Sequence, residues 1–151
     1  AMTHCDAGKL SKQHGEKAEY ALCAAQWHKS LTYEDNYFGN GMDYDRDYTA
    51  EYGSAPPYQS AESSAALLVW KAAFERANSF DTEKVRDALA KTDMQTFYGN
   101  IKFSNTGQNI AKPMVLFQVR CDGGKCANKV VAPTKWASAK LVHPVPTWSN
   151  R

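Results

Sequence analysis

Three acidic residues in the segment Asp43-Tyr-Asp-Arg-Asp47 have the alternating spacing with which calcium-binding loops begin. Such a loop also needs a glycine at its sixth position for a sharp turn and a glutamate at its twelfth as a bidentate ligand. Tyr48 and Ser54 stand at those two positions here. The sequence therefore predicts a solvated helix face in this segment and no calcium site.

Histidine and cysteine are the other residue types that could do chemistry, and their spacing matches no zinc motif. One hypothesis is a small hydrolase or thiol enzyme that pairs Cys5 or Cys23 with His4 or His28. It lacks a residue to orient the base, and no nucleophile elbow, phosphate loop or dinucleotide fingerprint is present. Glu62 has no visible partner as a catalytic acid. We therefore expect no enzymatic activity, no metal and no cofactor.

Cys121 and Cys126 flank Asp122-Gly-Gly124 between two strand-like runs, and this turn chemistry predicts a β-hairpin. Cysteines that face each other across such a turn lie within the separation that a disulfide needs. We expect a Cys121–Cys126 disulfide in an oxidising compartment, and two free thiols at the hairpin tip otherwise. Cys5 and Cys23 are predicted to be small buried residues rather than a second bridge.

Composition narrows the class of protein further. The chain has 151 residues, enough for one domain, with 18 basic and 16 acidic residues. This balance argues against nucleic acid as a partner. No signal peptide is visible, and no apolar run approaches the ~20 residues that a membrane span needs.

The N-terminal half predicts a short helix over residues 3–15, a strand over 19–25 and a helix from Asn40 to Tyr52, with Gly53 after its end. Tyr44, Tyr48 and Tyr52 share one face of that last helix. Next comes a long helix over 58–77, whose predicted apolar stripe is Ala61, Ala65, Leu68, Val69 and Ala72.

The C-terminal half begins with a helix that Asp81 caps and that buries Val85, Ala88 and Leu89. The remainder is predicted to be β structure. We expect residues 100–103 to pair with 114–120 across a turn at 105–107, and Val115, Phe117 and Val119 to face one way. The tail over 133–151 reads as extended and irregular, anchored by Trp136 and Trp148.

The order of these elements resembles the C-terminal part of the branched-chain amino-acid receptor-like periplasmic solute-binding proteins, which serve ATP-driven transporters. No single piece is specific, but the order and spacing are, from about Lys17 to Ala132. The pieces that carry the resemblance are Ala25-Gln-Trp27, Tyr52-Gly53, Pro57-Tyr58, Ala61-Glu62, Ala72-Ala-Phe-Glu-Arg-Ala77, Glu83-Lys-Val-Arg-Asp-Ala-Leu89, Phe97-Tyr-Gly99, Ile101-Lys-Phe103, Thr106-Gly-Gln108 and Lys112-Pro-Met114 through Gln118.

The resemblance implies an α/β, Rossmann-like partial periplasmic-binding fold, with helices packed on a small mixed sheet and a C-terminal β-hairpin. Residues 1–35 would end the second lobe, residues 36–111 would return into the first lobe, and residues 112–151 would form the crossover strands, hairpin and tail. We expect these segments to form one compact unit. Family members close two lobes over a ligand, and this chain resembles only the last two-fifths or so of such a protein.

Four residues carry over to ligand binding by motif: Tyr58 and Gln59 where the long helix enters the cleft, Trp27 after the second-lobe strand, and Asp6 near an acidic position for the ligand's ammonium. Three of them have a structural alternative, which is packing for Tyr58 and Trp27 and helix capping for Asp6.

The resemblance further implies a periplasmic or extracellular location. The implied partners are an amino acid or similar small carboxylate in the full-length protein, and the membrane subunits of a transporter. A fragment would expose surfaces that are normally covered, so we expect a homodimer or a segment-exchanged oligomer. The alternative is a stand-alone protein-interaction or assembly domain derived from this fold.

Overall fold

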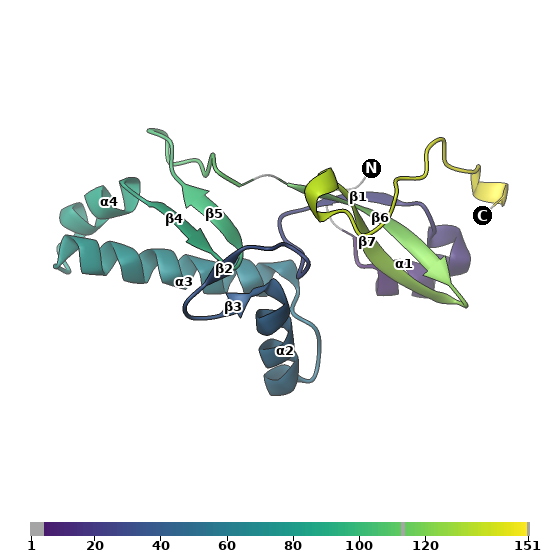
Figure 1. The fold of residues 1–151 in the computed structure, drawn as a ribbon, viewed down its shortest axis with the longest axis horizontal. Coiled ribbons are helices and arrows are strands. Elements are labelled where there is room, and N and C mark those ends of the chain that lie inside the picture. Colours follow the sequence, from purple (N-terminus) through teal and green to yellow (C-terminus); the bar gives the residue numbers. More distant parts are fainter. Residues whose placement is uncertain (1–4, 113, 151) are drawn as a thin grey trace. The chain divides into compact units, whose positions relative to one another are not determined.

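The computed structural model describes residues 5–112 and 114–150. The chain folds into two compact units. The split unit combines Ala1–His28 with Met114–Arg151, and the middle unit is Lys29–Pro113. The division arises because the first strand of the chain pairs with a strand that follows the middle segment, which builds its own core. Figure 1 draws the elements, and they confirm the predicted α/β class.

A three-stranded antiparallel sheet forms the centre of the split unit, in the order β1 (Leu22–Ala25), β6 (Val115–Asp122) and β7 (Lys125–Ala132). Helix α1 (Ala7–His14) packs against β7, and a 3-10 turn, η1 (Gly15–Ala18), follows it. Val115, Phe117 and Val119, which were predicted to face one way, are all buried, and β6–β7 is the predicted C-terminal hairpin.

The predicted pairing of residues 100–103 with 114–120 is wrong. Strand β5 (Gly99–Lys102) pairs with β4 (Asp93–Thr96), and β6 pairs with β1 and β7. A two-residue turn at Phe97-Tyr98 closes the β4–β5 hairpin locally, which costs less chain entropy than a longer connection. The turn at 105–107 instead closes a small loop, in which the Ser104 N–H donates to the Gln108 carbonyl at 2.9 Å.

Two disulfides belong to the split unit. Cys121 and Cys126 are partners in the β6–β7 register, 4.0 Å apart at their Cα atoms, and are bonded as the hairpin predicts. Cys5 and Cys23, expected to be unpaired, also form a disulfide, with Cα atoms 5.7 Å apart. The prediction failed because no local turn joins these two cysteines. Cys5 precedes α1 and Cys23 lies on β1, so the pair meets only once helix and strand have packed.

A buried glutamine helps to hold the C-terminal tail. The fully buried Gln118 donates through its side-chain amide to the Val142 carbonyl and accepts from the Val142 N–H, at 3.1 and 2.9 Å. Trp136, in η2 (Thr134–Trp136), is buried as expected. Trp148, in η3 (Trp148–Asn150), is 51% exposed, so it anchors the tail less than the sequence suggested.

Three helices dominate the middle unit: α2 (Gly41–Tyr52), α3 (Tyr58–Ala77) and α4 (Thr82–Ala90). Helix α4 packs against α3, and the β4–β5 hairpin lies along the same helix (Figure 1). The stripe of α3 is buried as predicted at Ala61, Ala65, Leu68 and Val69, but it continues through Ala73 instead of Ala72. No helix among the described residues is long and apolar enough to cross a membrane.

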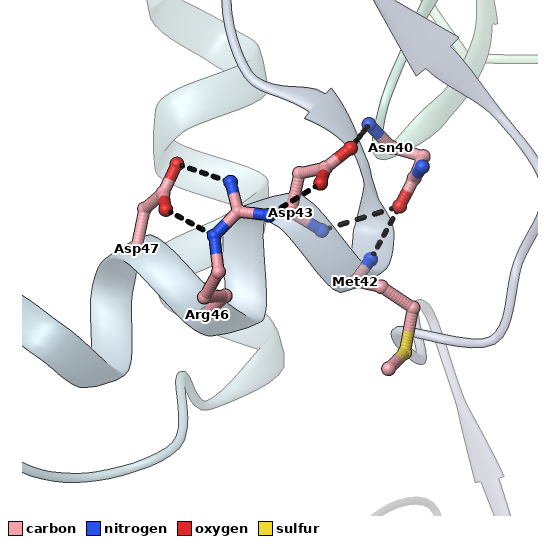
Figure 2. A network of polar contacts seen from close by, with 5 residues as sticks. All are labelled: Asn40, Met42, Asp43, Arg46 and Asp47. Carbon is pink, nitrogen blue, oxygen red and sulfur yellow. Dashed lines mark hydrogen bonds and ion pairs between the residues drawn. The ribbon is translucent and has the colours of Figure 1, made fainter.

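The start of α2 is fixed by the capping residue that the sequence indicates. The Asn40 side chain accepts from the N–H groups of Met42 and Asp43 at 2.8 and 3.2 Å, and the Asp43 carboxylate accepts from the Asn40 N–H at 3.1 Å (Figure 2). This reciprocal arrangement satisfies donors that a helix end leaves open. Asp43, the first residue of the acidic segment 43–47, is therefore part of a helix cap.

A single carboxylate ties the two hairpins of the middle unit together. Asp35 lies in the hairpin of β2 (Glu34–Asp35) and β3 (Gly39–Asn40). One of its oxygens accepts from the N–H groups of Tyr37 and Phe38, both at 2.8 Å, and the other accepts from the Phe97 N–H at 2.7 Å. Asp35 thus holds the turn of the β4–β5 hairpin in place.

Candidate functional site

Four side chains gather near the start of α3 in the middle unit: Tyr58, Glu62, Tyr98 and Lys112. Tyr58 and Glu62 are one helical turn apart and share a face. Tyr98 comes from the turn of the β4–β5 hairpin, and the Lys112 ammonium lies 3.2 Å from the centre of its ring. Glu62 acts electrostatically on both Tyr98 and Lys112, so the cluster holds one charge of each sign.

Gly99 makes room for the lysine. Its φ of +143° belongs to a region that residues with a side chain rarely adopt, and a Cβ there would lie 2.8 Å from Cε of Lys112. The aliphatic stem of Lys112 therefore runs directly over the Gly99 backbone to reach the Tyr98 ring. The Phe97-Tyr-Gly99 turn supplies both the aromatic face and the space beside it.

The surroundings of the cluster change its acid–base chemistry. Burial lowers the pKa of Lys112 from 10.5 to about 7, and the nearby Glu62 carboxylate opposes this shift without cancelling it. Burial also raises the pKa of the Tyr98 phenol well above its ordinary value, so it stays protonated. Near neutral pH, Lys112 therefore takes up or releases a proton easily, and an anion bound beside it would favour the charged form.

An apolar pocket of about 390 Å³ adjoins Glu62 and Tyr98. This volume lies within the range of small-molecule sites, which are mostly apolar with a few polar groups at fixed places. The pocket lies between α3, α4 and the β4–β5 hairpin. Its lining residues are Glu62, Ala65, Ala66, Val69, Trp70, Leu89, Tyr98, Ile101, Phe103 and Asn109.

The four ligand-binding residues expected from the sequence do not gather in one unit. Asp6 and Trp27 belong to the split unit, and Tyr58 and Gln59 to the middle unit. Asp6 caps α1 by accepting from the Lys9 N–H at 3.0 Å, which is the capping role considered as the alternative for this residue. Trp27 is only 4% exposed, which agrees with the alternative of a packing role. Gln59 lines a different hollow from Glu62, between α2 and α3.

Sequence reasoning did not assign Tyr98 or Lys112 to a site, and it found no partner for Glu62. The only local signal was the aromatic-glycine turn at 97–99. Lys112 lies 13 residues further along, and nothing in its own neighbours predicts burial over a tyrosine ring.

The thiol-enzyme hypothesis loses its nucleophile, because Cys5 and Cys23 are bonded to each other. His4 lies outside the described residues, and the ring of His28 packs edge-on against Phe117 at 5.3 Å. Within residues 5–112 and 114–150, no three histidine, cysteine, aspartate or glutamate side chains come together as metal ligands.

The arrangement in the middle unit can bind a small charged molecule. A carboxylate and an ammonium lie beside two aromatic side chains, and an apolar pocket adjoins them. Such a set can hold the two charged ends of a small zwitterion and enclose an apolar side chain.

Comparison with known proteins identifies the family. Residues 1–125 match the family described as periplasmic binding proteins, and the chain belongs to that family. A leucine-binding protein from Thermotoga maritima superposes with a TM-score of 0.67 at 26% identity, covering 89% of this chain. A periplasmic binding protein from Burkholderia mallei has a TM-score of 0.66 at 18% identity over the same share. An ABC transporter substrate-binding protein from Desulfitobacterium hafniense, in complex with Leu, has a TM-score of 0.57 at 20% identity and covers 74% of this chain.

The chain spans only part of these relatives. It covers 37% of the length of the Thermotoga and Burkholderia proteins and 31% of the Desulfitobacterium protein. The family match and the structural relatives confirm the family and the fold that the sequence resembles.

Proposed function

We propose that this chain provides part of the ligand-binding receptor of an ABC transporter, acting in the periplasm or outside the cell without enzymatic activity. Its family membership supports the receptor role, and two structural relatives are a leucine-binding protein and a substrate-binding protein in complex with Leu. The observation that carries the proposal is that Glu62, which lines an apolar pocket of the middle unit, acts electrostatically on Lys112.

The ligand that fits this cluster is an amino acid with an apolar side chain. Its carboxylate would lie against the Lys112 ammonium, and its ammonium against Glu62 and the faces of Tyr58 and Tyr98. Its side chain would enter the pocket next to Trp70, where burial of apolar surface favours binding. Gln59, Trp27 and Asp6 would contribute only in the whole receptor.

Titration of the chain with leucine, followed by calorimetry and by tryptophan fluorescence, tests this proposal. Trp70 lines the pocket and is 45% exposed, so ligand burial should shift its emission. We expect Lys112→Met and Glu62→Gln each to weaken leucine binding about tenfold, the effect of losing roughly 1.4 kcal/mol. Lys84→Met, an exposed lysine on α4, is the matched control and should bind as the original chain does.

Ligand chemistry and pH sharpen the test. Isocaproate lacks the ammonium of leucine and leucinamide lacks the carboxylate, so each should bind more weakly than leucine. Because the pKa of Lys112 is about 7, a bound carboxylate must draw a proton onto this amine at higher pH, and affinity should fall from pH 6.5 to 8.5. Equal binding by Lys112→Met, or an affinity independent of pH, would remove Lys112 from the site.

A further inference from the structure

A second hollow in the middle unit lies between α2 and α3, away from the apolar pocket. On α2, Tyr44, Asp47, Tyr48, Glu51 and Tyr52 follow the i, i+3, i+4, i+7, i+8 spacing of one helix face. On α3, residues 59, 60, 63 and 64 face them. The groove between the helices has a volume of about 650 Å³, and its remaining lining residues are Phe38, Gln59, Ser60, Ser63 and Ser64.

Three tyrosine rings form one wall of this groove. Tyr44 is buried and stacks on Phe97 at 4.3 Å, and its ring lies 5.9 Å from that of Tyr48. Tyr48 in turn lies 4.5 Å from Tyr52, which is 65% exposed. The rings therefore lead from the core to solvent, and the outermost ring is open to a ligand.

Hydroxyl groups form the facing wall. Tyr44 and Ser64 share a hydrogen bond of 3.0 Å, and Tyr48 and Ser60 share one of 3.2 Å. Among the described residues, Tyr52 makes no matching hydrogen bond to a serine of α3, a helix that begins at Tyr58 after a double proline. These two hydrogen bonds thus join the helices at the inner end of the groove.

The two charged residues in the lining, Asp47 and Glu51, are both acidic, and no basic residue lines the groove. Asp47 pairs with Arg46 at 2.8 Å, and Arg46 also reaches Asp43 on the solvent side of α2 (Figure 2). Among the described residues, Glu51 forms no ion pair within 4.0 Å. The mouth of the groove therefore presents a negative charge beside the exposed ring of Tyr52.

We propose that this groove is a binding site for a small aliphatic amine, such as a linear diamine. One ammonium would lie between Glu51 and the faces of Tyr48 and Tyr52, where ion pairing and the ring electrons both favour a cation. The methylene chain would run along the tyrosine wall, and the Ser60 and Ser63 hydroxyls would accept from the inner amine. A neutral sugar also suits aromatic rings and hydroxyls, but it would not use the charge of Glu51.

Calorimetric titration with putrescine at low ionic strength tests the proposal, with chemical-shift mapping to locate the ligand. We expect binding that weakens as salt is added, with shifts confined to α2 and the first turns of α3. Glu51→Gln and Tyr52→Leu should each reduce affinity about three- to tenfold, in the range for one partly exposed cation contact. Both side chains are exposed, so circular dichroism should show unchanged folding.

The matched control is Glu83→Gln, which removes an exposed carboxylate from α4, outside the groove. It should leave putrescine affinity unchanged. If Glu83→Gln weakens binding as much as Glu51→Gln does, the amine is responding only to net charge and the proposal fails. Binding of glucose but not putrescine would also overturn it. Leucine should not compete with putrescine, so this site and the Lys112 cluster can fail separately.

Discussion

At Lys112, burial disfavours the charged form of the side chain. An ammonium is strongly hydrated, yet this one lies over the Tyr98 ring with its stem against Gly99. The ring face and the Glu62 carboxylate replace only part of the lost hydration, so burial lowers the pKa to about 7. In the proposed receptor site, a bound carboxylate would stabilise the charged form of Lys112 and so offset the free-energy cost of its lost hydration.

The stability of the protein should therefore depend on the charge of Lys112. Its pKa is about 7 when folded and 10.5 ordinarily, so between these values the unfolded chain holds a proton that the folded chain lacks. The stabilising contribution of this group is present above pH 10.5 and is lost as pH falls toward 7. We expect Lys112→Met to be more stable than the original chain at pH 6 in urea unfolding, with the difference shrinking by pH 9.

Lys84→Met serves again as the control, since that side chain is exposed. Its free energy of unfolding should run parallel to that of the original chain across the same pH range. A Lys112→Met curve that is equally parallel would mean that Lys112 is solvated and titrates normally.

Asp35 offers a second test at the scale of one residue. Asp35→Ala removes the acceptor for three backbone N–H groups and should cost roughly 2–4 kcal/mol in urea unfolding. Asp35→Asn keeps one oxygen that can still accept from Tyr37 and Phe38, so it should cost less. Asp87→Asn, on the exposed face of α4, should be nearly neutral. Equal losses for Asp35→Ala and Asp87→Asn would show that the hairpins are not held by this carboxylate.

At the scale of elements, the two disulfides should differ in their effect. A cross-link stabilises mainly by restricting the unfolded chain, and it does so more when it closes a longer loop. The Cys5–Cys23 bond has a sequence separation of 18 and the Cys121–Cys126 bond one of 5. Replacing both cysteines of a pair by serine should cost about 3 kcal/mol for the first and about 2 kcal/mol for the second. Thermal unfolding of the two double variants checks the order, and the reverse order would contradict the loop argument.

Local signals predicted the helices well and the strand pairing poorly. Asn40, Gly53 and Asp81 cap or end their helices as expected, because capping depends on residues within one turn. The partner of β5 could not be chosen locally, since the turns at 97–98 and at 105–107 both suit a hairpin. The Cys5–Cys23 bond and the Lys112–Tyr98 contact join distant elements, so only the assembled fold reveals them.

At the scale of the whole molecule, self-association remains a prediction. Leu67 and Trp70 on α3 are 68% and 45% exposed, and Phe80 just beyond the helix is 90% exposed. The rings of Trp70, Phe74 and Phe80 form a row, in which the ring centre of Phe74 lies 5.6 Å from that of Trp70 and 5.5 Å from that of Phe80. Contiguous apolar surface of this kind marks interaction sites, and we expect a second copy to cover it.

Size-exclusion chromatography with light scattering measures this directly. The chain should elute as a dimer, and Leu67→Ser with Phe80→Ser should shift it toward the monomer. The substitution Tyr52→Ser, at a 65% exposed ring on α2, is the control. A monomer at all concentrations would show that the row is not a contact between copies.

The sheet of the split unit has a consequence for engineering. Ala25 on β1 and Val115 on β6 are direct partners in an antiparallel pair, so the whole middle unit occupies the place of a hairpin loop. Loop-closure entropy grows only slowly with length, which is why a pair of strands tolerates so large an insertion. We therefore expect that the middle unit can be deleted without loss of the sheet. A gene in which a two-residue turn such as Asn-Gly joins β1 to β6 should encode a disulfide-stapled, three-stranded miniprotein.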